Sequence, residues 1–201
     1  MMEWTAFEDQ ARAEGYTCIC GIDEAGRGPL AGPVYAAAVV LRPGQVIEGV
    51  NDSKKLSKKK REALFDTICS QCAAYGIGSA TEKEIDEINI LNATYLAMQR
   101  AVAALPVQPD CALVDGNRAP DLPLEVRTII KGDAQSASIA AASILAKVSR
   151  DRYMLQMAEK YPQYAFEKHK GYGTKLHYER LEQYGISPIH RLSFLKKWMN
   201  R

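Results

Sequence analysis

The feature that most constrains this chain is a pair of adjacent carboxylates at the end of an apolar run. Residues 17–22 are rich in β-branched residues and cysteine, which predicts a buried strand, and Asp23 and Glu24 follow directly. A buried carboxylate pair is costly unless its charge is neutralised, and a hard divalent cation bound through oxygen is the usual solution. The Gly-Arg-Gly at 26–28 comes next, and its glycines let the backbone approach a ligand closely because they carry no Cβ. We therefore expect a cation and ligand site where this strand ends.

Two further acids stand at predicted element boundaries. Asp115 follows an apolar run at 111–114, and Asp133 precedes a long alanine-rich helical stretch. Each has an ordinary explanation, since an aspartate followed by glycine is a common turn and Asp133 is a good helix N-cap. The adjacent acids Asp23 and Glu24 have neither explanation. If the strands that carry Asp23 and Asp115 are neighbours, their carboxylates converge to about 5 Å, the spacing between paired strands.

Converging carboxylates have a specific chemical use. Three or four of them form an octahedral oxygen site suited to Mg²⁺ or Mn²⁺. Two such ions roughly 4 Å apart can activate a water and stabilise the leaving oxygen in a phosphodiester displacement. The sequence offers no Ser-His-Asp arrangement as an alternative to this carboxylate metal site. We expect the three histidines at the surface or on the substrate side rather than as metal ligands; they are His169, His177 and His190.

The order of the predicted elements indicates an α/β domain. Ligands gather at the carboxyl ends of strands in open α/β sheets, which suits a site at Asp23 and Asp115. We expect one domain over 1–201, with a catalytic core at 1–160 and a C-terminal helical, substrate-binding extension at 161–201. Helices are expected at 1–16, 57–74, from a capping box at 81–84, and at 92–105, 134–160, 174–184 and 190–198; strands are expected at 17–23, 33–41, 75–79, 111–114 and 126–130, and a loop at 161–173.

Charge is distributed unevenly although the net charge is only +2. Residues 160–201 hold nine Lys or Arg against three Asp or Glu, and residues 54–61 hold a second basic cluster. Such patches fit a polyanionic partner, but solvated helix faces explain either patch equally well on its own. Five cysteines, with no signal peptide and no apolar membrane span, indicate reduced thiols in a cytoplasmic protein without membrane association. No dimerisation stripe stands out, so we expect a monomer.

Short motifs occur along the chain in a fixed order. They are DEAGRGPLAGP at 23–33, NDSKKLS at 51–57, INILNAT at 88–94, VDG at 114–116, KGD at 131–133, SIAAASILAKVSRD at 138–151 and KGYGT at 170–174. Together they make the chain resemble ribonuclease HII. The resemblance implies a ribonuclease H-like fold with a mixed five-stranded sheet flanked by helices. It also implies endonucleolytic cleavage of RNA in RNA–DNA hybrids, and cutting 5′ of single ribonucleotides embedded in duplex DNA to leave a 3′-hydroxyl and a 5′-phosphate.

The resemblance also implies roles for individual residues. Only the 2′-hydroxyl distinguishes RNA from DNA at one nucleotide, and a glycine-rich loop lets backbone groups reach it. The catalytic carboxylates and ligands of Mg²⁺ or Mn²⁺ correspond to Asp23, Glu24, Asp115 and Asp133. The ribose-sensing loop corresponds to Gly26, Arg27 and Gly28, and the stacking tyrosine corresponds to Tyr172.

The nucleic acid is expected to contact further side chains. Arg27 can hold a phosphate bidentately. Tyr172 can lie against a neighbouring deoxyribose, although a loop tyrosine taken alone is better explained by packing onto the core. Asp151 is expected to pair with a basic neighbour on the long helix. The candidates for phosphate contacts are Lys54, Lys55, Lys168, Lys170 and Lys175.

Two other functions fit parts of the sequence. A catalytically inactive module that binds RNA–DNA hybrids would share the motifs, but the intact carboxylates speak against it. A nucleotide-binding oxidoreductase is suggested by glycines at 26, 28 and 32. Their spacing is not G-x-G-x-x-G, however, and a strand rather than a helix follows.

Overall fold

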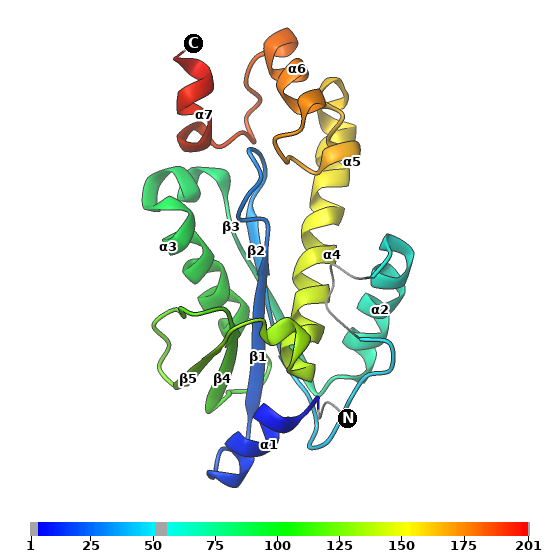
Figure 1. Ribbon diagram of the computed structural model, residues 1–201, viewed down its shortest axis with the longest axis vertical. Helices are drawn as coiled ribbons and strands as arrows, with labels where there is room; N and C mark the ends of the chain where they lie inside the picture. Colours follow the sequence, from blue (N-terminus) through cyan, green and yellow to red (C-terminus); the bar gives the residue numbers. More distant parts are fainter. Residues whose placement is uncertain (1–3, 51–55, 201) are drawn as a thin grey trace.

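A mixed five-stranded sheet forms the centre of the computed structural model, which describes residues 4–50 and 56–200 (Figure 1). Its strands are β1 (Ile19–Ala25), β2 (Val34–Val40), β3 (Ala74–Ala80), β4 (Cys111–Asp115) and β5 (Glu125–Ile129). Their order across the sheet is β3-β2-β1-β4-β5. The pairs β1–β2 and β2–β3 are antiparallel, whereas β1–β4 and β4–β5 are parallel. This arrangement confirms the predicted mixed sheet.

Helices cover both faces of the sheet, as predicted for an α/β domain. α3 (Glu82–Ala103) packs on one face and α4 (Ala137–Lys160) on the other, where α2 (Lys58–Gln71) packs against it (Figure 1). The close approach of α4 depends on Gly21 in β1. A Cβ at Gly21 would lie 2.3 Å from backbone atoms at the start of α4, so a larger residue would push the helix away from the sheet.

Helix α3 begins where the sequence predicts and is interrupted at Asn89, close to the start of the second helix predicted at 92–105. The Thr81 hydroxyl accepts a hydrogen bond from the Glu84 N–H, and the Glu84 carboxylate accepts one from the Thr81 N–H, which is the predicted capping box. At Asn89 the backbone leaves the helical region, with φ at 67°. The Asn89 side chain accepts hydrogen bonds from the N–H groups of Leu91 and Asn92 and so caps the second helical segment.

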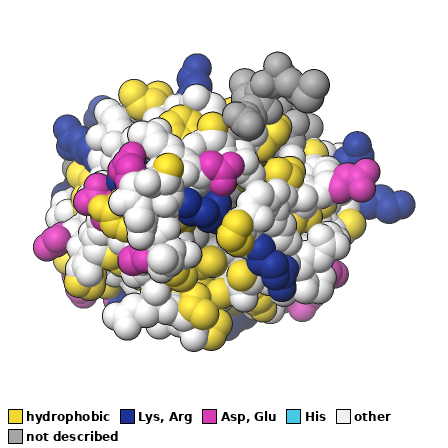
Figure 2. All heavy atoms as spheres, turned by 90° about the horizontal axis from the view of Figure 1, so that it is seen from below, with side chains coloured by type: hydrophobic (Ala, Val, Ile, Leu, Met, Phe, Trp, Pro, Cys, Tyr) yellow, Lys and Arg dark blue, Asp and Glu magenta, His cyan; other side chains and the backbone are white. Residues whose placement is uncertain are grey.

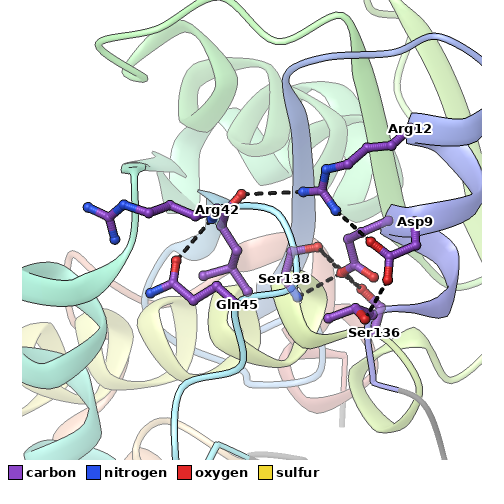
Figure 3. Close-up of polar contacts among 9 residues, drawn as sticks. Asp9, Arg12, Arg42, Gln45, Ser136 and Ser138 are labelled. Carbon is purple, nitrogen blue, oxygen red and sulfur yellow. Dashed lines mark hydrogen bonds and ion pairs between the residues drawn. The ribbon is translucent and has the colours of Figure 1, made fainter.

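The N-terminal helix α1 (Ala6–Ala13) holds the start of α4 in place (Figure 3). The buried Glu8 accepts hydrogen bonds through Oε1 from the hydroxyls of Ser136 and Ser138, both at 2.6 Å. Figure 3 shows both serines pointing toward α1. A carboxylate at a helix N-terminus is stabilising because it complements the helix dipole. The same contact anchors the 3₁₀ turn η2 (Gly132–Ala134), which lies just before Ser136.

The C-terminal extension lies beyond the end of the sheet, with α7 (Leu192–Met199) above α3 and with α5 (Phe166–His169) and α6 (Lys175–Tyr184) beside the C-terminal end of α4 (Figure 1). Helices α6 and α7 agree with the two helices predicted there. The prediction of a loop at 161–173 is wrong in part. This stretch contains the 3₁₀ turn η3 (Pro162–Tyr164) and the short helix α5. Left-handed backbone at both ends of α5 sets its length, and the sequence pattern carries no sign of it.

The three histidines are buried in this extension, so the expectation that they lie at the surface or on the substrate side is wrong. The Nε2 atoms of His177 and His190 are 2.9 Å apart. The rings of His169 and His177 stack with their centroids 4.2 Å apart, and Phe166 lies edge-on to both. The histidines therefore form the polar centre of a small core that joins α5, α6 and the segment before α7.

The opposite end of the molecule, around α1, carries charges of both signs (Figure 2). Lys and Arg lie scattered among Asp and Glu on this face. On α1 itself, Arg12 pairs with Asp9 at 3.0 Å. A face of mixed charge does not suit a polyanion. A bilayer-spanning helix needs a long apolar run, and none of the helices in residues 4–50 and 56–200 has one.

Candidate active site

Three aspartates from different elements meet at one edge of the sheet. Asp23 lies near the end of β1, Asp115 is the last residue of β4, and Asp133 lies in η2. Because β1 and β4 are parallel neighbours with Ile22 opposite Val114, Asp23 and Asp115 come next to each other. One carboxylate oxygen from each of the three aspartates lies within 4.8 Å of the other two. The structure thus brings together three of the four acids predicted from the sequence.

Backbone N–H groups orient two of these carboxylates. The Glu24 N–H donates to Asp23 Oδ1 at 2.7 Å, and the Gly132 N–H donates to Asp115 Oδ1 at 2.6 Å. The Asp133 N–H also points at Asp115 Oδ1, at 3.4 Å. The end of β4 and the turn η2 are therefore tied together through the carboxylate of Asp115.

Asp133 does not cap the long helix. Ser136 is the N-cap of α4, and its hydroxyl accepts a hydrogen bond from the Ile139 N–H at 3.3 Å. Asp133 lies three residues earlier and is 5% exposed. The helix-capping explanation of Asp133 is therefore wrong, and its carboxylate belongs to the aspartate group.

Burial raises the free-energy cost of placing these negatively charged carboxylates together. Asp23 is buried, and its pKa is raised well above its usual range, first by burial and then by the negative charges of Glu24 and Asp115. A hydrogen bond from the Ser143 side chain acts in the opposite direction. A cation among these oxygens would remove the repulsion. Carboxylate oxygens alone suit a hard ion such as Mg²⁺ or Mn²⁺, so the donor set fits the cation that the sequence predicts.

Glu24 points to the other face of β1, because successive residues of a strand alternate. There it borders a small hollow with Thr94 of α3, and its Oε1 lies 3.4 Å from Nη1 of Arg27. It also borders the pocket that contains Asp23 and Asp115. Glu24 therefore shares this pocket with Asp23 and Asp115, and its negative charge acts on Asp23.

Asp23 and Asp115 open into a pocket of about 290 Å³. Tyr172 stands at its rim, 43% exposed, with its ring edge against Gly28, where a Cβ would lie 3.8 Å from Cε1. The ring is thus available to a ligand and is not folded onto the core. The residues that line the pocket are Asp23, Glu24, Ala25, Gly26, Arg27, Gly28, Arg61, Asp115, Ser143, Lys147 and Tyr172.

Comparison with known proteins identifies the family. Residues 20–197 match the protein family described as Ribonuclease HII. The chain belongs to the ribonuclease HII family. The ribonuclease HII of Caldicellulosiruptor bescii is 60% identical over 189 residues, which cover 94% of this chain and 92% of that protein. The ribonuclease HII of Marinomonas sp. (strain MWYL1) is 61% identical over 177 residues, which cover 88% of this chain and 89% of that protein.

A solved structure supports the same family. The crystal structure of ribonuclease H2 from Pyrococcus horikoshii OT3 is similar with a TM-score of 0.73 at 30% identity, covering 88% of this chain and 93% of that one. These findings confirm both the resemblance to ribonuclease HII and the ribonuclease H-like fold. The protein is accordingly a ribonuclease H, an enzyme that hydrolyses RNA in RNA–DNA hybrids.

Three polar side chains of the ribonuclease HII pocket were not predicted as site residues. Ser143 and Lys147 are four residues apart on α4 and so share one helix face, a spacing visible in the sequence. Arg61 belongs to the basic cluster at 54–61, and its Nη1 donates to the Leu56 carbonyl at 2.5 Å. The predicted partner of Asp151 on the long helix is Lys147, at 2.7 Å. Lys147 and Arg61 thus add positive charge to the pocket, and the Ser143 side chain hydrogen-bonds Asp23.

The lysines predicted to contact phosphates are placed only in part. Lys54 and Lys55 lie outside the described residues. Lys170 follows α5, its Nζ donates to the Glu167 carbonyl, and burial lowers its pKa. Lys168 and Lys175 are exposed on the extension. The surface of the extension can therefore present cations to a duplex that enters the ribonuclease HII pocket.

Proposed function

We propose that this ribonuclease H is a divalent metal-dependent endonuclease that cuts RNA in hybrids and also cuts 5′ of a single ribonucleotide in duplex DNA. The products would carry a 3′-hydroxyl and a 5′-phosphate. The observation that carries the proposal is a single pocket lined both by Asp23 and Asp115 of the aspartate group and by the loop at 26–28 with Tyr172. The carboxylates suit a cation, and the loop with Tyr172 suits one sugar.

The aspartates would hold the cation. Asp23, Asp115 and Asp133 supply converging oxygens, and Glu24 lies beside them. A bound divalent ion would supply charge stabilisation for the reacting phosphate and lower the pKa of an attacking water. The backbone hydrogen bonds to Asp23 and Asp115 keep these carboxylates oriented before any substrate binds.

The loop at 26–28 and Tyr172 would recognise the ribonucleotide. The backbone of this loop reaches the pocket, and the 2′-hydroxyl is the one group that distinguishes the target sugar from its neighbours. Tyr172 would lie against the adjacent deoxyribose. Arg27, which is held loosely by Glu24 at 3.4 Å, is positioned to contact a phosphate next to the cut. Lys147 would add a second phosphate contact.

The extension at 161–201 would bind the duplex on the far side of the cut. Tyr172 comes from this extension and reaches the pocket of the core, which supports the predicted division into a core at 1–160 and a substrate-binding extension. Its exposed lysines would contact phosphates without reading sequence.

The decisive experiment is product mapping on a labelled duplex that contains one ribonucleotide, with Mg²⁺ and Mn²⁺ supplied separately. We expect one cut on the 5′ side of the ribonucleotide. Asp23→Asn should lower the rate at least ~100-fold while duplex binding is retained, because it removes a charged metal ligand. The matched control is Asp121→Asn, which removes one negative charge at an exposed position away from the pocket.

The possible outcomes separate the candidate functions. Full activity of Asp23→Asn would contradict the metal site. Tight binding of hybrids without cleavage in either metal would favour the inactive binding module. Cleavage confined to long hybrids would remove the single-ribonucleotide activity from the proposal and leave the ribonuclease H activity in place.

A further inference from the structure

A buried arginine of the C-terminal extension holds the loop after β1 from behind. Arg191 is 0% exposed. Its Nη2 donates to the Gly26 carbonyl at 2.6 Å and its Nη1 donates to the Arg27 carbonyl at 2.9 Å. Its Nε donates to the Gly32 carbonyl at 2.8 Å. One guanidinium group therefore fixes both ends of the glycine loop.

The backbone sets the position of this arginine. Two hydrogen bonds of 2.8 Å and an antiparallel bridge join residues 189–191 to residues 30–32. The segment before α7 thus runs along the loop as a short additional strand. Because the two segments are paired, the guanidinium of Arg191 stays in register with the loop.

Burying the Arg191 guanidinium in this way lowers the stability of the folded protein. In the described part of the chain, the hydrogen-bond partners of the Arg191 guanidinium are carbonyl oxygens and not carboxylates. Burial, followed by the nearby charge of Arg150, lowers the pKa of Arg191 to about 9. The negative charges of Glu82 and Asp86 oppose this shift without offsetting it. A buried charge whose hydrogen bonds go to neutral carbonyls is less stable than a well-packed apolar side chain. The three hydrogen bonds that Arg191 donates to the loop therefore explain an arginine at this position better than a contribution to stability does.

The hydrogen bonds to the Gly26 and Arg27 carbonyls fix the direction of two peptide groups. In a trans peptide the C=O and the following N–H point in opposite directions, and the described chain has no cis peptide. With the Gly26 and Arg27 carbonyls drawn toward Arg191, the N–H groups of Arg27 and Gly28 point away from it. Within residues 4–50 and 56–200, neither N–H donates a hydrogen bond to the protein. Both residues line the pocket that contains the aspartates.

We propose that Arg191 is a positioning residue for ribonucleotide recognition, which presents the N–H groups of Arg27 and Gly28 to the 2′-oxygen of one sugar. The proposal rests on the proposed function, because it takes the loop at 26–28 as the part that recognises the ribose. Lysine cannot replace this arginine, since one ammonium on a flexible stem does not span three carbonyls held in a fixed fork.

The test measures binding of two duplexes that differ only in one 2′-hydroxyl, without divalent cation so that neither is cut. The readout is the ratio of the two dissociation constants. For the unmodified protein we expect the ribonucleotide duplex to bind about tenfold more tightly, the factor that one or two hydrogen bonds supply. In Arg191→Lys this ratio should fall below about threefold, while affinity for the all-DNA duplex stays within about twofold.

The control is Tyr164→Phe, which loosens the same extension without touching the loop. The Tyr164 hydroxyl is buried and donates to the Gly185 carbonyl at 2.9 Å. This variant should lower the melting temperature and leave the ratio unchanged. A ratio in Arg191→Lys equal to that of the unmodified protein would overturn the proposal, as would an equal loss of affinity for both duplexes.

A measurement on the unmodified protein covers the case in which Arg191→Lys does not fold. The amide hydrogens of Arg27 and Gly28 should exchange rapidly in the free protein and become protected by the ribonucleotide duplex but not by the all-DNA duplex. Equal protection by both duplexes would overturn the proposal. If the unmodified protein neither prefers nor cuts the ribonucleotide duplex, the proposed single-ribonucleotide activity fails instead, and the two failures are distinguishable.

Discussion

A fall in pH from 7 to 5 should destabilise this protein through two histidines of the C-terminal extension. The Ser187 N–H donates to Nδ1 of His190 at 2.9 Å, so His190 carries its proton on Nε2 and donates it to Nε2 of His177. His177 then carries its own proton on Nδ1 and donates it to the Tyr172 carbonyl at 2.9 Å. Both rings are neutral in this network. A second proton on His177 would face the Nε2–H of His190 instead of an acceptor, and a second proton on His190 would break the hydrogen bond from the Ser187 N–H.

The magnitude follows from the pKa values. Burial lowers the pKa of His177 and of His190 from 6.5 to about 4. Because the folded pKa lies below the unfolded one, the unfolded state binds more protons between pH 6.5 and 4, and stability falls as the pH falls through this window. Moving from pH 7 to pH 5 therefore costs about 2 kcal/mol for each histidine, or about 4 kcal/mol for two independent groups. Asp23 opposes this loss, since its raised pKa makes the folded state gain protons on acidification.

The assay is urea unfolding at pH 5, 6 and 7, with the free energy of unfolding compared between the unmodified protein and the double variant His177→Asn with His190→Asn. The variant will be less stable at neutral pH because it loses ring packing. Its loss between pH 7 and pH 5 should nevertheless be smaller by about 4 kcal/mol, because asparagine does not titrate. Asp23 contributes equally to both proteins and cancels. Equal losses in the two proteins would refute the reasoning.

Three further outcomes are expected. Tyr172→Ala should reduce cutting at a single ribonucleotide more than it reduces binding of all-DNA duplex, and equal losses in the two assays would contradict its role at the pocket rim. Lys147→Met should weaken the salt dependence of duplex binding by about one phosphate contact, measured as the slope of log K against log salt, and an unchanged slope would exclude that contact. Glu8→Ala should lower the free energy of unfolding by about 3 kcal/mol, because it leaves the Ser136 and Ser138 hydroxyls without their carboxylate partner at a helix N-terminus. In calorimetry this corresponds to a fall of roughly 6–12 °C in melting temperature, whereas the exposed Asp9→Asn on the same helix should change it little.

Features that depend on local chemistry were predictable from the sequence. The capping box at Thr81 and Glu84 forms because the two side chains are three residues apart, whatever packs around them. The meeting of Asp23 and Asp115 follows from two apolar strands that end in acids, once those strands are parallel neighbours. Glu24 lines the same pocket as Asp23 and Asp115, and its role as a metal ligand stays a prediction.

Features that depend on distant segments were not predictable. The histidines are polar by type, and only the tertiary structure shows that they satisfy one another in a small core. The N-cap of α4 is Ser136 because Glu8, more than a hundred residues away, gathers the serine hydroxyls, whereas the sequence around Asp133 favours the aspartate equally well. Arg191 contributes to the predicted excess of basic residues in 160–201, yet it is buried and adds nothing to the exposed charge of that surface.

The site joins two parts that the fold supports independently. The aspartates are fixed by the sheet edge and by η2, which α1 anchors through Glu8 at the start of α4. The loop at 26–28 is fixed by Arg191 from the C-terminal extension. Because β1 carries Asp23 and then leads straight into this loop, only a few residues of chain separate Asp23 from the loop. Under the proposed function, such a short connection would let the enzyme cut at a defined position relative to one sugar without reading the bases around it.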